Sequence, residues 1–386
     1  MRLAIFISHP IQYYSPIFAY LSSRIDLHVF YLSDPTPSDH AKAGFDTEFS
    51  WDLDLLTGYN FSFLKDAGYH DQSGASLSNF SYIFQILKTG KFDAALVIGW
   101  YLHGLRLAIL ALKILKIPLA VRGDSHLDTK RSSWKTIVKN IVFSRFLSLI
   151  DGVLYVGTKS REYYEHYKVA SSKMFYSPHC VDTVRFSLTA TQEAREELRL
   201  REGIEQNEKV VLFAGKLLPF KRPMDIVEAL GILKSRGQNI RMMIAGSGPL
   251  ERQIRQRGES LGIAITFLGF QNQTQMPAAY AAADLLVLPS DGRETWGLVA
   301  NEALACGVPI IVSDQVGCAP DLAREGIAGR VFPAANIQAL ADTIAISLSD
   351  PPPREAIERL SNSHSIEAAC KGILNAINSF RGEPNL

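Results

Sequence analysis

The amino-acid sequence predicts an α/β protein of two successive domains, each built on a parallel sheet that helices cover on both faces. Short apolar runs alternate with segments of helical period, and the alternation restarts after residue 205. With 386 residues, the chain is also too long for one compact core. Because such sheets bind ligands beyond the carboxyl ends of their strands, chemistry is expected in the loops that follow the strands.

In the first half of the chain, five short apolar runs are the predicted strands. They are Leu3–Ile7, Leu27–Leu32, Ala94–Ile98, Leu119–Arg122 and Gly152–Val156. Longer segments between them carry apolar residues at helical spacing. Those predicted helices include Tyr82–Lys88, Leu105–Leu115 and Ser133–Leu149. Since helices connect the strands, the strands are expected to be parallel.

The same rhythm returns in the second half of the chain, again with helices after the strands. The predicted strands there are Val210–Ala214, Arg241–Ala245, Ile265–Leu268, Asp284–Leu288 and Pro309–Val312. The segment Ser177–Asp182 and a polar stretch over residues 192–206 separate the two series. A helix is predicted within that stretch, near Thr191–Leu200, and the domain boundary is expected in this region.

These features set the expected domain limits. An amino-terminal domain is expected over residues 1–185 and a carboxyl-terminal domain over residues 186–365. Three prolines at 351–353 interrupt the chain before a last helix, Ile366–Phe380. We expect residues 366–386 to pack back on the amino-terminal domain.

Composition and charge exclude several classes of protein. The formal net charge is +1, which gives no indication of nucleic-acid binding. The four cysteines have no C-x-x-C or zinc-ligand spacing, so buried thiols in a reducing compartment are expected. The amino-terminal apolar run is too short for a secretory signal, and no uncharged run reaches the roughly 18 residues of a membrane span. We therefore expect a cytoplasmic protein.

The loop after the predicted strand Asp284–Leu288 contains several residues that could bind a ligand or take part in a reaction. It contains Glu294 and then, eight positions further on, Glu302. A helix is predicted from near Thr295 to Gly307, and the unpaired N–H groups of its first turn could hold a phosphate. Glu302 falls on the apolar stripe of that helix, where a carboxylate needs a donor. A ribose diol would supply one, and so would a backbone N–H or an arginine of the protein.

Two other loops follow strands in the same half. Lys216 and Lys221 lie just before a helix that opens at Pro223, and lysine binds phosphate as a point charge. Each lysine taken singly is equally typical of a solvated surface. Gly246 and Gly248, in Gly-Ser-Gly-Pro, would let a ligand approach the backbone, although a tight turn has the same pattern.

Together these motifs resemble the retaining family-four glycosyltransferases, also described as glycosyl transferases group 1. The ordered set is Gly215-Lys216, Lys221, Gly246-Ser-Gly-Pro, Phe267-Leu-Gly-Phe, the two glutamates eight positions apart, and Ala-Cys-Gly-Val-Pro-Ile. The resemblance is strong over residues 208–335. It implies the GT-B fold, in which two Rossmann-like domains with parallel sheets face each other across an interdomain cleft.

The resemblance also implies roles for individual residues. Lys221 matches the lysine that holds the donor diphosphate, and Lys216 stands where relatives usually carry an arginine for the same purpose. Glu302 matches the acid that binds the donor ribose, and Glu294 matches the acid near the transferred sugar. Further donor contacts are implied for the backbone of Gly215, Gly246, Gly248, Thr295, Trp296, Gly297, Leu298 and Val299.

The first half departs from the family pattern. The loop after the first strand has no glycine and reads His9-Pro-Ile-Gln12-Tyr13, which suits contact with a sugar or acceptor and equally suits a packed connection. Many relatives place a histidine after the strand that here ends near Arg122. In this chain Arg122 or Asp124 could hold that place, and His126 is a further candidate for contact with the sugar or acceptor.

The predicted function is transfer of a sugar from a UDP- or GDP-sugar to an acceptor hydroxyl with retention, in polysaccharide, lipopolysaccharide or glycoconjugate biosynthesis. The acceptor could be a sugar, a lipid-linked molecule or a small molecule. No Asp-x-Asp follows a strand in a place suited to Mg²⁺, so we expect no metal and no cofactor. The alternatives are a nucleotide-sugar epimerase or sugar phosphorylase of the same fold, and a non-catalytic nucleotide-binding module.

The segment 130–149 predicts a basic amphipathic helix. One face would be apolar and the other positive, which is typical of a helix in a membrane interface, and an apolar face that covers the sheet gives the same pattern. The apolar set is Trp134, Ile137, Val138, Ile141 and Val142, and the basic set is Lys130, Arg131, Lys135, Lys139 and Arg145. Peripheral contact with the inner face of a membrane is therefore one expectation.

Overall fold

The computed structural model describes residues 1–40, 48–64, 77–128 and 133–382, which form two compact units. Unit 1 contains Met1–Pro35, Asp54–His179 and Ile366–Leu386. Unit 2 contains Thr36–Leu53 and Cys180–Ser365. The division after His179 differs from the boundary expected at residue 185. The assignment of Thr36–Leu53 to unit 2 had no signal in the sequence.

Unit 1 is built on a seven-stranded parallel sheet with the strand order β3-β2-β1-β4-β5-β6-β7. Its strands are β1 (Arg2–Ile7), β2 (Asp26–Tyr31), β3 (Asn60–Phe63), β4 (Ala94–Ile98), β5 (Leu119–Gly123), β6 (Gly152–Tyr155) and β7 (Met174–Tyr176). The central strands β1, β4 and β5 are apolar and buried along almost their whole length. Burial on both faces explains why they read as continuous apolar runs.

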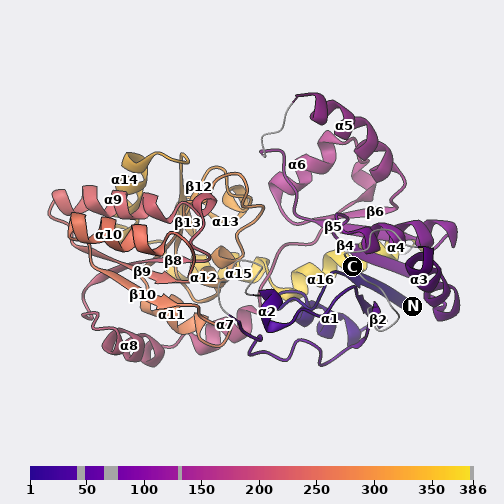
Figure 1. Ribbon diagram of the computed structural model, residues 1–386, viewed down its shortest axis with the longest axis horizontal. Coiled ribbons are helices and arrows are strands. Elements are labelled where there is room, and N and C mark those ends of the chain that lie inside the picture. The colour runs from indigo at the N-terminus through magenta and orange to yellow at the C-terminus, as the bar shows by residue number, and fades with distance from the viewer. Residues whose placement is uncertain (41–47, 65–76, 129–132, 383–386) are drawn as a thin grey trace. The chain divides into compact units, whose positions relative to one another are not determined.

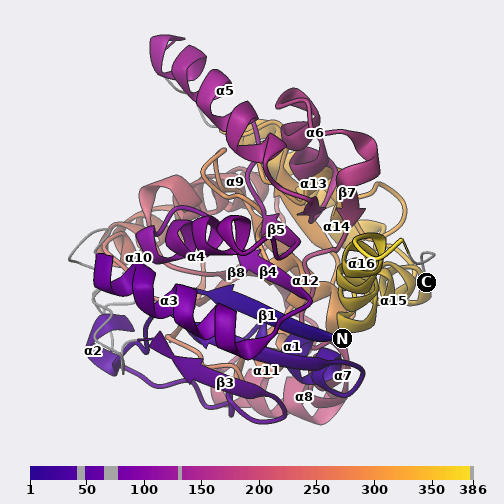
Figure 2. The same cartoon turned by 90° about the vertical axis from the view of Figure 1, so that its right-hand side faces the viewer.

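Helices cover both faces of this sheet. They are α1 (Ser15–Ser22), α3 (Leu77–Gly90), α4 (His103–Ile114), α5 (Ser133–Ser148), α6 (Thr158–His166) and α16 (Ile366–Ser379), whereas α2 (Pro37–His40) belongs to unit 2. Figure 2 shows α3 and α4 side by side across the strands. On the other side, α16 packs on α1 and on β5 to β7. This packing is close, since a Cβ on Gly372 would lie 1.8 Å from the carbonyl oxygen of Tyr176.

Unit 2 has a six-stranded parallel sheet with the order β10-β9-β8-β11-β12-β13. Its strands are β8 (Lys209–Ala214), β9 (Ile240–Ala245), β10 (Ile265–Gly269), β11 (Leu285–Leu288), β12 (Ile310–Ser313) and β13 (Gly329–Phe332). Its helices are α7 (Thr183–Thr189), α8 (Gln192–Arg201), α9 (Pro223–Ser235), α10 (Glu251–Leu261), α11 (Met276–Ala282), α12 (Val299–Ala305), α13 (Ala319–Leu322), α14 (Ile337–Ser349) and α15 (Arg354–Ser363). Helices α9 and α14 lie together over the sheet (Figure 1).

The strands that the sequence did not reveal are all at sheet edges. They are β3 and β7 in unit 1 and β13 in unit 2, and each has three or four residues. An edge strand buries less of its surface than a central one, so it needs no continuous apolar run. One helix was also placed too early, because α12 begins at Val299 and not near Thr295.

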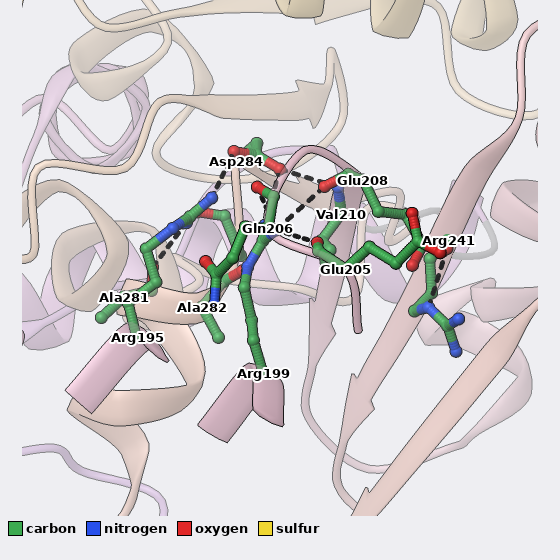
Figure 3. A network of polar contacts seen from close by, with 11 residues as sticks. Arg195, Arg199, Glu205, Gln206, Glu208, Val210, Arg241, Ala281, Ala282 and Asp284 are labelled. Atoms are coloured by element: carbon green, nitrogen blue, oxygen red, sulfur yellow. Dashed lines mark hydrogen bonds and ion pairs between the residues drawn. The ribbon is translucent and has the colours of Figure 1, made fainter. Parts of the chain in front are cut away.

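A buried arginine network fixes the amino-terminal edge of the unit 2 sheet (Figure 3). Arg199 of α8 is fully buried, and its guanidinium donates to the carbonyl oxygens of residues 205, 206, 208 and 282. It also binds Asp284 with an N–O distance of 3.0 Å, and Arg195 binds the other oxygen of Asp284 at the same distance. The Asp284 carboxylate in turn accepts the backbone N–H of Val210. These contacts tie α8 to strands β8 and β11.

Candidate active site

Three glycines shape the loops at the carboxyl edge of the unit 2 sheet. Gly215, Gly246 and Gly248 have φ values of 140°, 147° and 150°, which strongly favour glycine. A Cβ on Gly246 would lie 2.0 Å from the carbonyl oxygen of Gly215, and one on Gly248 would lie 2.8 Å from the backbone nitrogen of Leu217. The glycines therefore let two loops pack directly on each other. This packing requires glycine whether or not a ligand also approaches.

The loop after β8 carries Lys221 to the loop after β11. The backbone N–H of Asp291 donates to the carbonyl oxygen of Phe220 at 2.9 Å, so the two loops are joined beside the lysine. Lys221 Nζ lies 2.5 Å from Glu294 Oε2, and both side chains are about 15% exposed. The Ser290 hydroxyl donates to the same carboxylate oxygen at 3.1 Å. Lys221 and Glu294, singled out separately in the sequence, thus form one ion pair.

Lys216 and Arg222 lie before and after Lys221 in the sequence. Lys216 is half-buried in the loop that the glycines shape. Arg222, which sequence reasoning did not single out, has a left-handed φ of 52° and lies at the start of α9. Its guanidinium makes two contacts with the Asp225 carboxylate, at 2.7 and 3.1 Å. That bidentate contact stabilises a backbone conformation that a non-glycine residue rarely adopts.

Glu302 is buried on α12, as its position on the apolar stripe predicted, with 2% of its surface exposed. Its Oε2 accepts a hydrogen bond of 2.6 Å from the Tyr280 hydroxyl, and Tyr280 is itself fully buried. From the sequence, the expected donor was a backbone N–H, an arginine or a ribose. Tyr280 was not predicted because it lies on the preceding helix, 22 positions away.

The chain enters α12 through a turn that needs glycine. Gly297 has a φ of 94°, and a Cβ on Gly317 would lie 1.7 Å from the carbonyl oxygen of Thr295. The Trp296 side chain is buried, and its indole N–H donates to Asn301 at 2.8 Å. Trp296 therefore offers a ligand its backbone and not its ring. Leu298 is the N-cap residue of α12, and Val299 is its first residue.

In unit 1, Arg122 is buried in the protein interior. Its guanidinium donates to the Tyr14 hydroxyl at 2.6 Å and to the carbonyl oxygens of Ser177 and Pro178 at 3.1 and 2.9 Å. Only 1% of its surface is exposed. It thus joins strand β5 to the start of α1 and to the segment that follows β7. Of the three candidates after β5, Arg122 is the least accessible to a ligand.

Asp124 and His126 lie beyond the same strand. Asp124 Oδ2 is 3.8 Å from His179 Nε2, and the Asp124 side chain is 43% exposed. His126 is buried, its Nδ1 accepts the backbone N–H of Asp128, and within the described residues its buried Nε2 has no hydrogen-bond partner. Burial lowers the pKa of both His126 and His179. The nitrogen atoms of these imidazoles and the open carboxylate suit hydrogen bonds with the hydroxyl groups of a ligand.

The loop after β1 is only half-buried at the candidate residues. His9 Nδ1 lies 2.9 Å from the Ser8 hydroxyl oxygen, and Gln12 and Tyr13 are half-buried. Tyr14, next in the chain, was not predicted and reaches Arg122. No group of three metal-ligating side chains occurs among the residues that the structure describes, and the four cysteines are buried thiols.

Comparison with known proteins finds sequence similarity in the second half of the chain. Residues 194–363 match the model of the family described as glycosyl transferases group 1. A D-inositol 3-phosphate glycosyltransferase from Corynebacterium glutamicum (strain R) is 38% identical over 169 residues, which are 42% of this chain and 39% of that protein. The chain spans about two fifths of the length of the first curated relatives it matches. Within unit 2, residues 194–363 are therefore similar to the glycosyl transferases group 1 family.

Solved structures resemble the chain over almost its whole length. A glycosyltransferase from Rickettsia africae ESF-5 aligns with a TM-score of 0.76 and 15% identity, covering 99% of both chains. Anabaena Alr3699/HepE in complex with UDP aligns with a TM-score of 0.74 and 16% identity, covering 98% of this chain and all of that one. At such identities the likeness shows the fold alone. The predicted GT-B fold class is confirmed.

Proposed function

We propose that the chain is a retaining glycosyltransferase that moves a sugar from a UDP- or GDP-sugar to an acceptor hydroxyl. The observation that carries the proposal is the pairing of Lys221 with Glu294 at the carboxyl edge of unit 2. It places a cation and a carboxylate, both partly exposed, within the segment that matches the family. The named activities of the relatives and the UDP bound by the Anabaena protein support the same class of donor.

In this proposal the donor diphosphate binds Lys221 and Lys216, together with backbone N–H groups from Thr295 to Val299. Glu302 binds the ribose, and the backbone at Gly215, Gly246 and Gly248 lines the loops nearby. Phosphate competes with Glu294 for the Lys221 ammonium group. Donor binding therefore draws Lys221 toward the diphosphate and leaves Glu294 to accept a hydroxyl of the sugar.

Transfer then needs positioning and charge stabilisation more than a covalent intermediate. The bond between the anomeric carbon and the phosphate oxygen breaks, and its electron pair stays on the diphosphate, where the lysines stabilise the charge. The acceptor oxygen forms the new bond on the same face of the sugar. Its proton passes to an oxygen of the leaving diphosphate, so the anomeric configuration is retained.

We propose that no metal ion takes part, because the two lysines supply the positive charge that Mg²⁺ would otherwise bring to the diphosphate. The expectation is that turnover is unchanged after dialysis against EDTA. Loss of turnover with the chelator, and its recovery with Mg²⁺ or Mn²⁺, would contradict this part of the proposal.

The acceptor is proposed to bind unit 1 through Asp124, His126 and the loop with His9, Gln12 and Tyr13. Arg122 is proposed to support that surface from beneath and not to touch the acceptor. The setting would be polysaccharide, lipopolysaccharide or glycoconjugate biosynthesis in the cytoplasm. A sugar, a lipid-linked molecule or a small molecule such as the inositol phosphate named for one relative fits this chemistry.

We also propose that unit 1 contacts an anionic membrane surface through α4 and α5. These helices form a groove of about 550 Å³ whose walls include Leu110, Val142 and Phe146. Leu110 and Val142 are 50% and 62% exposed, and the rim includes Arg106 and Lys113. Exposed apolar side chains beside positive charge suit an anionic lipid interface.

Most of the residues predicted to contact the membrane do not support this proposal, because their side chains are not described. Lys130 and Arg131 lie outside the described residues, as do the side chains of Trp134, Lys135, Ile137, Val138, Lys139 and Ile141. Among the described residues, no helix has the length and apolar character needed to cross a bilayer. Flotation with phosphatidylglycerol-containing vesicles is expected for the wild type and should weaken in Val142→Asp. Equal flotation of both, or flotation of neither, would contradict the docking surface.

Incubation with a nucleotide sugar, with and without acceptor, tests the activity. A transferase leaves the donor largely intact until an acceptor is present and then releases the nucleoside diphosphate. An epimerase changes the sugar without acceptor, a phosphorylase requires phosphate, and a binding module gives no product. Nuclear magnetic resonance of the anomeric proton in the product tests retention.

A further inference from the structure

A hydroxyl group contacts each of the two glutamates in the candidate site. The Tyr280 hydroxyl donates to Glu302 at 2.6 Å, and the Ser290 hydroxyl donates to Glu294 at 3.1 Å. Both hydroxyl-bearing residues are fully buried. Glu294 has Lys221 as a counter-ion as well, so its orientation has two supports.

Tyr280 is held in place by contacts on several sides. Its ring packs edge-on against Phe186 of α7, with centroids 6.2 Å apart. The residues that follow it accept hydrogen bonds from the arginine network of Figure 3. Arg195 donates to the carbonyl oxygens of Ala281 and Ala283, and Arg199 donates to that of Ala282, at 2.7, 3.2 and 2.9 Å. The end of α11 is therefore fixed to α8 and, through Asp284, to the sheet.

A chain of contacts thus runs from the amino-terminal edge of the sheet to Glu302. Asp284 binds Arg195 and Arg199, these arginines hold the end of α11, and α11 carries Tyr280. The terminal torsion of a glutamate is broad and has little intrinsic preference, so a carboxylate needs external contacts to fix its plane. A hydroxyl donor that cannot move supplies such a contact.

We propose that Tyr280 is a positioning residue that orients the Glu302 carboxylate toward the ribose of the donor. The proposal rests on the proposed function, because it requires that Glu302 binds the nucleotide. Tyr280 itself touches no substrate in this account and acts only through Glu302. The arginine network is what keeps Tyr280 at the required place.

The test uses the full chain with Tyr280→Phe, Glu302→Gln and the double variant, each titrated by calorimetry with UDP and GDP. Tyr280→Phe is expected to weaken binding of the preferred nucleotide about tenfold, since a hydrogen bond to a charged group is lost. Glu302→Gln is expected to weaken it by at least as much. If Tyr280 acts through Glu302, the double variant binds no more weakly than Glu302→Gln alone.

Inorganic pyrophosphate separates orientation of Glu302 from general damage to the site. It has no ribose, so its affinity should be the same in the wild type and in Tyr280→Phe. Phe186→Leu serves as a structural control, because it removes ring packing on Tyr280 and leaves the hydroxyl. Its melting temperature should fall without the selective loss of nucleotide affinity.

Two results would overturn the proposal. One is Tyr280→Phe binding the nucleotide as tightly as the wild type, and the other is independent, multiplicative losses in the double variant. A wild-type chain that binds no nucleoside diphosphate would instead contradict the proposed function itself, so the two failures are distinguishable.

Discussion

The carboxyl edges of the two sheets use charge in different ways. In unit 2 the charged side chains meet each other, with Lys221 2.5 Å from Glu294 and both partly open to solvent. In unit 1 the buried cation Arg122 donates to neutral oxygen atoms of Tyr14, Ser177 and Pro178. In a partly exposed ion pair, a ligand can replace one of the two partners. A buried arginine cannot give up its carbonyl partners for a ligand without loss of packing. From this difference we propose that the charge of a ligand is bound in unit 2 and that Arg122 has a supporting role in unit 1.

The two buried arginines allow the comparison to be tested through stability. Arg199→Met removes the guanidinium that satisfies Asp284 and four carbonyl groups, and should cost about 3–5 kcal/mol of unfolding free energy. Arg122→Met leaves a hydroxyl and two carbonyl groups without a donor and should cost about 1–3 kcal/mol. Chemical denaturation of both variants measures which loss of unfolding free energy is larger. A larger loss for Arg122→Met would show that unit 1 depends on its arginine more than the contacts indicate.

Lys221→Ala should give the largest loss of transfer. We expect the rate to fall on the order of 10²–10³-fold, as when one donor to a developing charge is removed. Lys221→Arg keeps the charge and should retain far more activity. Steady-state assays with a nucleotide sugar compare the two variants. Equal losses in both would mean that the shape of the lysine matters more than its charge.

Glu294→Gln should have opposite effects on binding and on turnover. Without the carboxylate, Lys221 has no competing anion, so affinity for a nucleoside diphosphate should rise by a few fold. Transfer should fall, because the sugar loses a charged acceptor worth about 1.5–3 kcal/mol. Calorimetry and turnover measured on one preparation provide both values. Weaker diphosphate binding in this variant would show that Glu294 supports the phosphate site and does not compete with it.

The smallest expected effect is the pH dependence of unit 1. Burial lowers the pKa of His28, His126 and His179 in this unit, and of His364 in unit 2. A histidine of lowered pKa binds fewer protons when folded than when unfolded, so its contribution is complete above about pH 6.5 and is lost as the pH falls below that value. His179→Asn should therefore flatten the decline in unfolding free energy between pH 7 and pH 5. An unchanged slope would mean that folding does not lower the pKa of His179.

How much the sequence could predict differed between the same two regions. In unit 2 the loops require glycine at Gly246, Gly248 and Gly297, and glycines at fixed distances from strands are visible in a sequence. The burial of Glu302 also followed from the apolar spacing of its helix. Tyr280 could not be predicted as its partner, because helical spacing does not reveal which residues of two different helices meet.

Less of unit 1 could be predicted from the sequence. Arg122 lies in an otherwise apolar strand with no special backbone geometry, and its partners Tyr14 and Ser177 are 108 and 55 positions away. Nothing local distinguishes such an arginine from an exposed one. The place of Thr36–Leu53 in unit 2 could not be predicted either, because its contacts there are also distant in the sequence. Asn272 donates to the Ser50 carbonyl oxygen at 2.8 Å, and the rings of Phe49 and Phe270 are 4.3 Å apart.

Nucleotide binding measured by thermal unfolding tests the central claim most directly. The wild-type chain and Lys221→Ala would each be unfolded with UDP, GDP or ADP. A nucleoside diphosphate at 100 times its dissociation constant should stabilise the wild type by about 2.7 kcal/mol. The account predicts that UDP or GDP gives this stabilisation and that Lys221→Ala loses most of it. The absence of stabilisation by any nucleoside diphosphate, or equal stabilisation of the two proteins, would contradict a donor site built around Lys221.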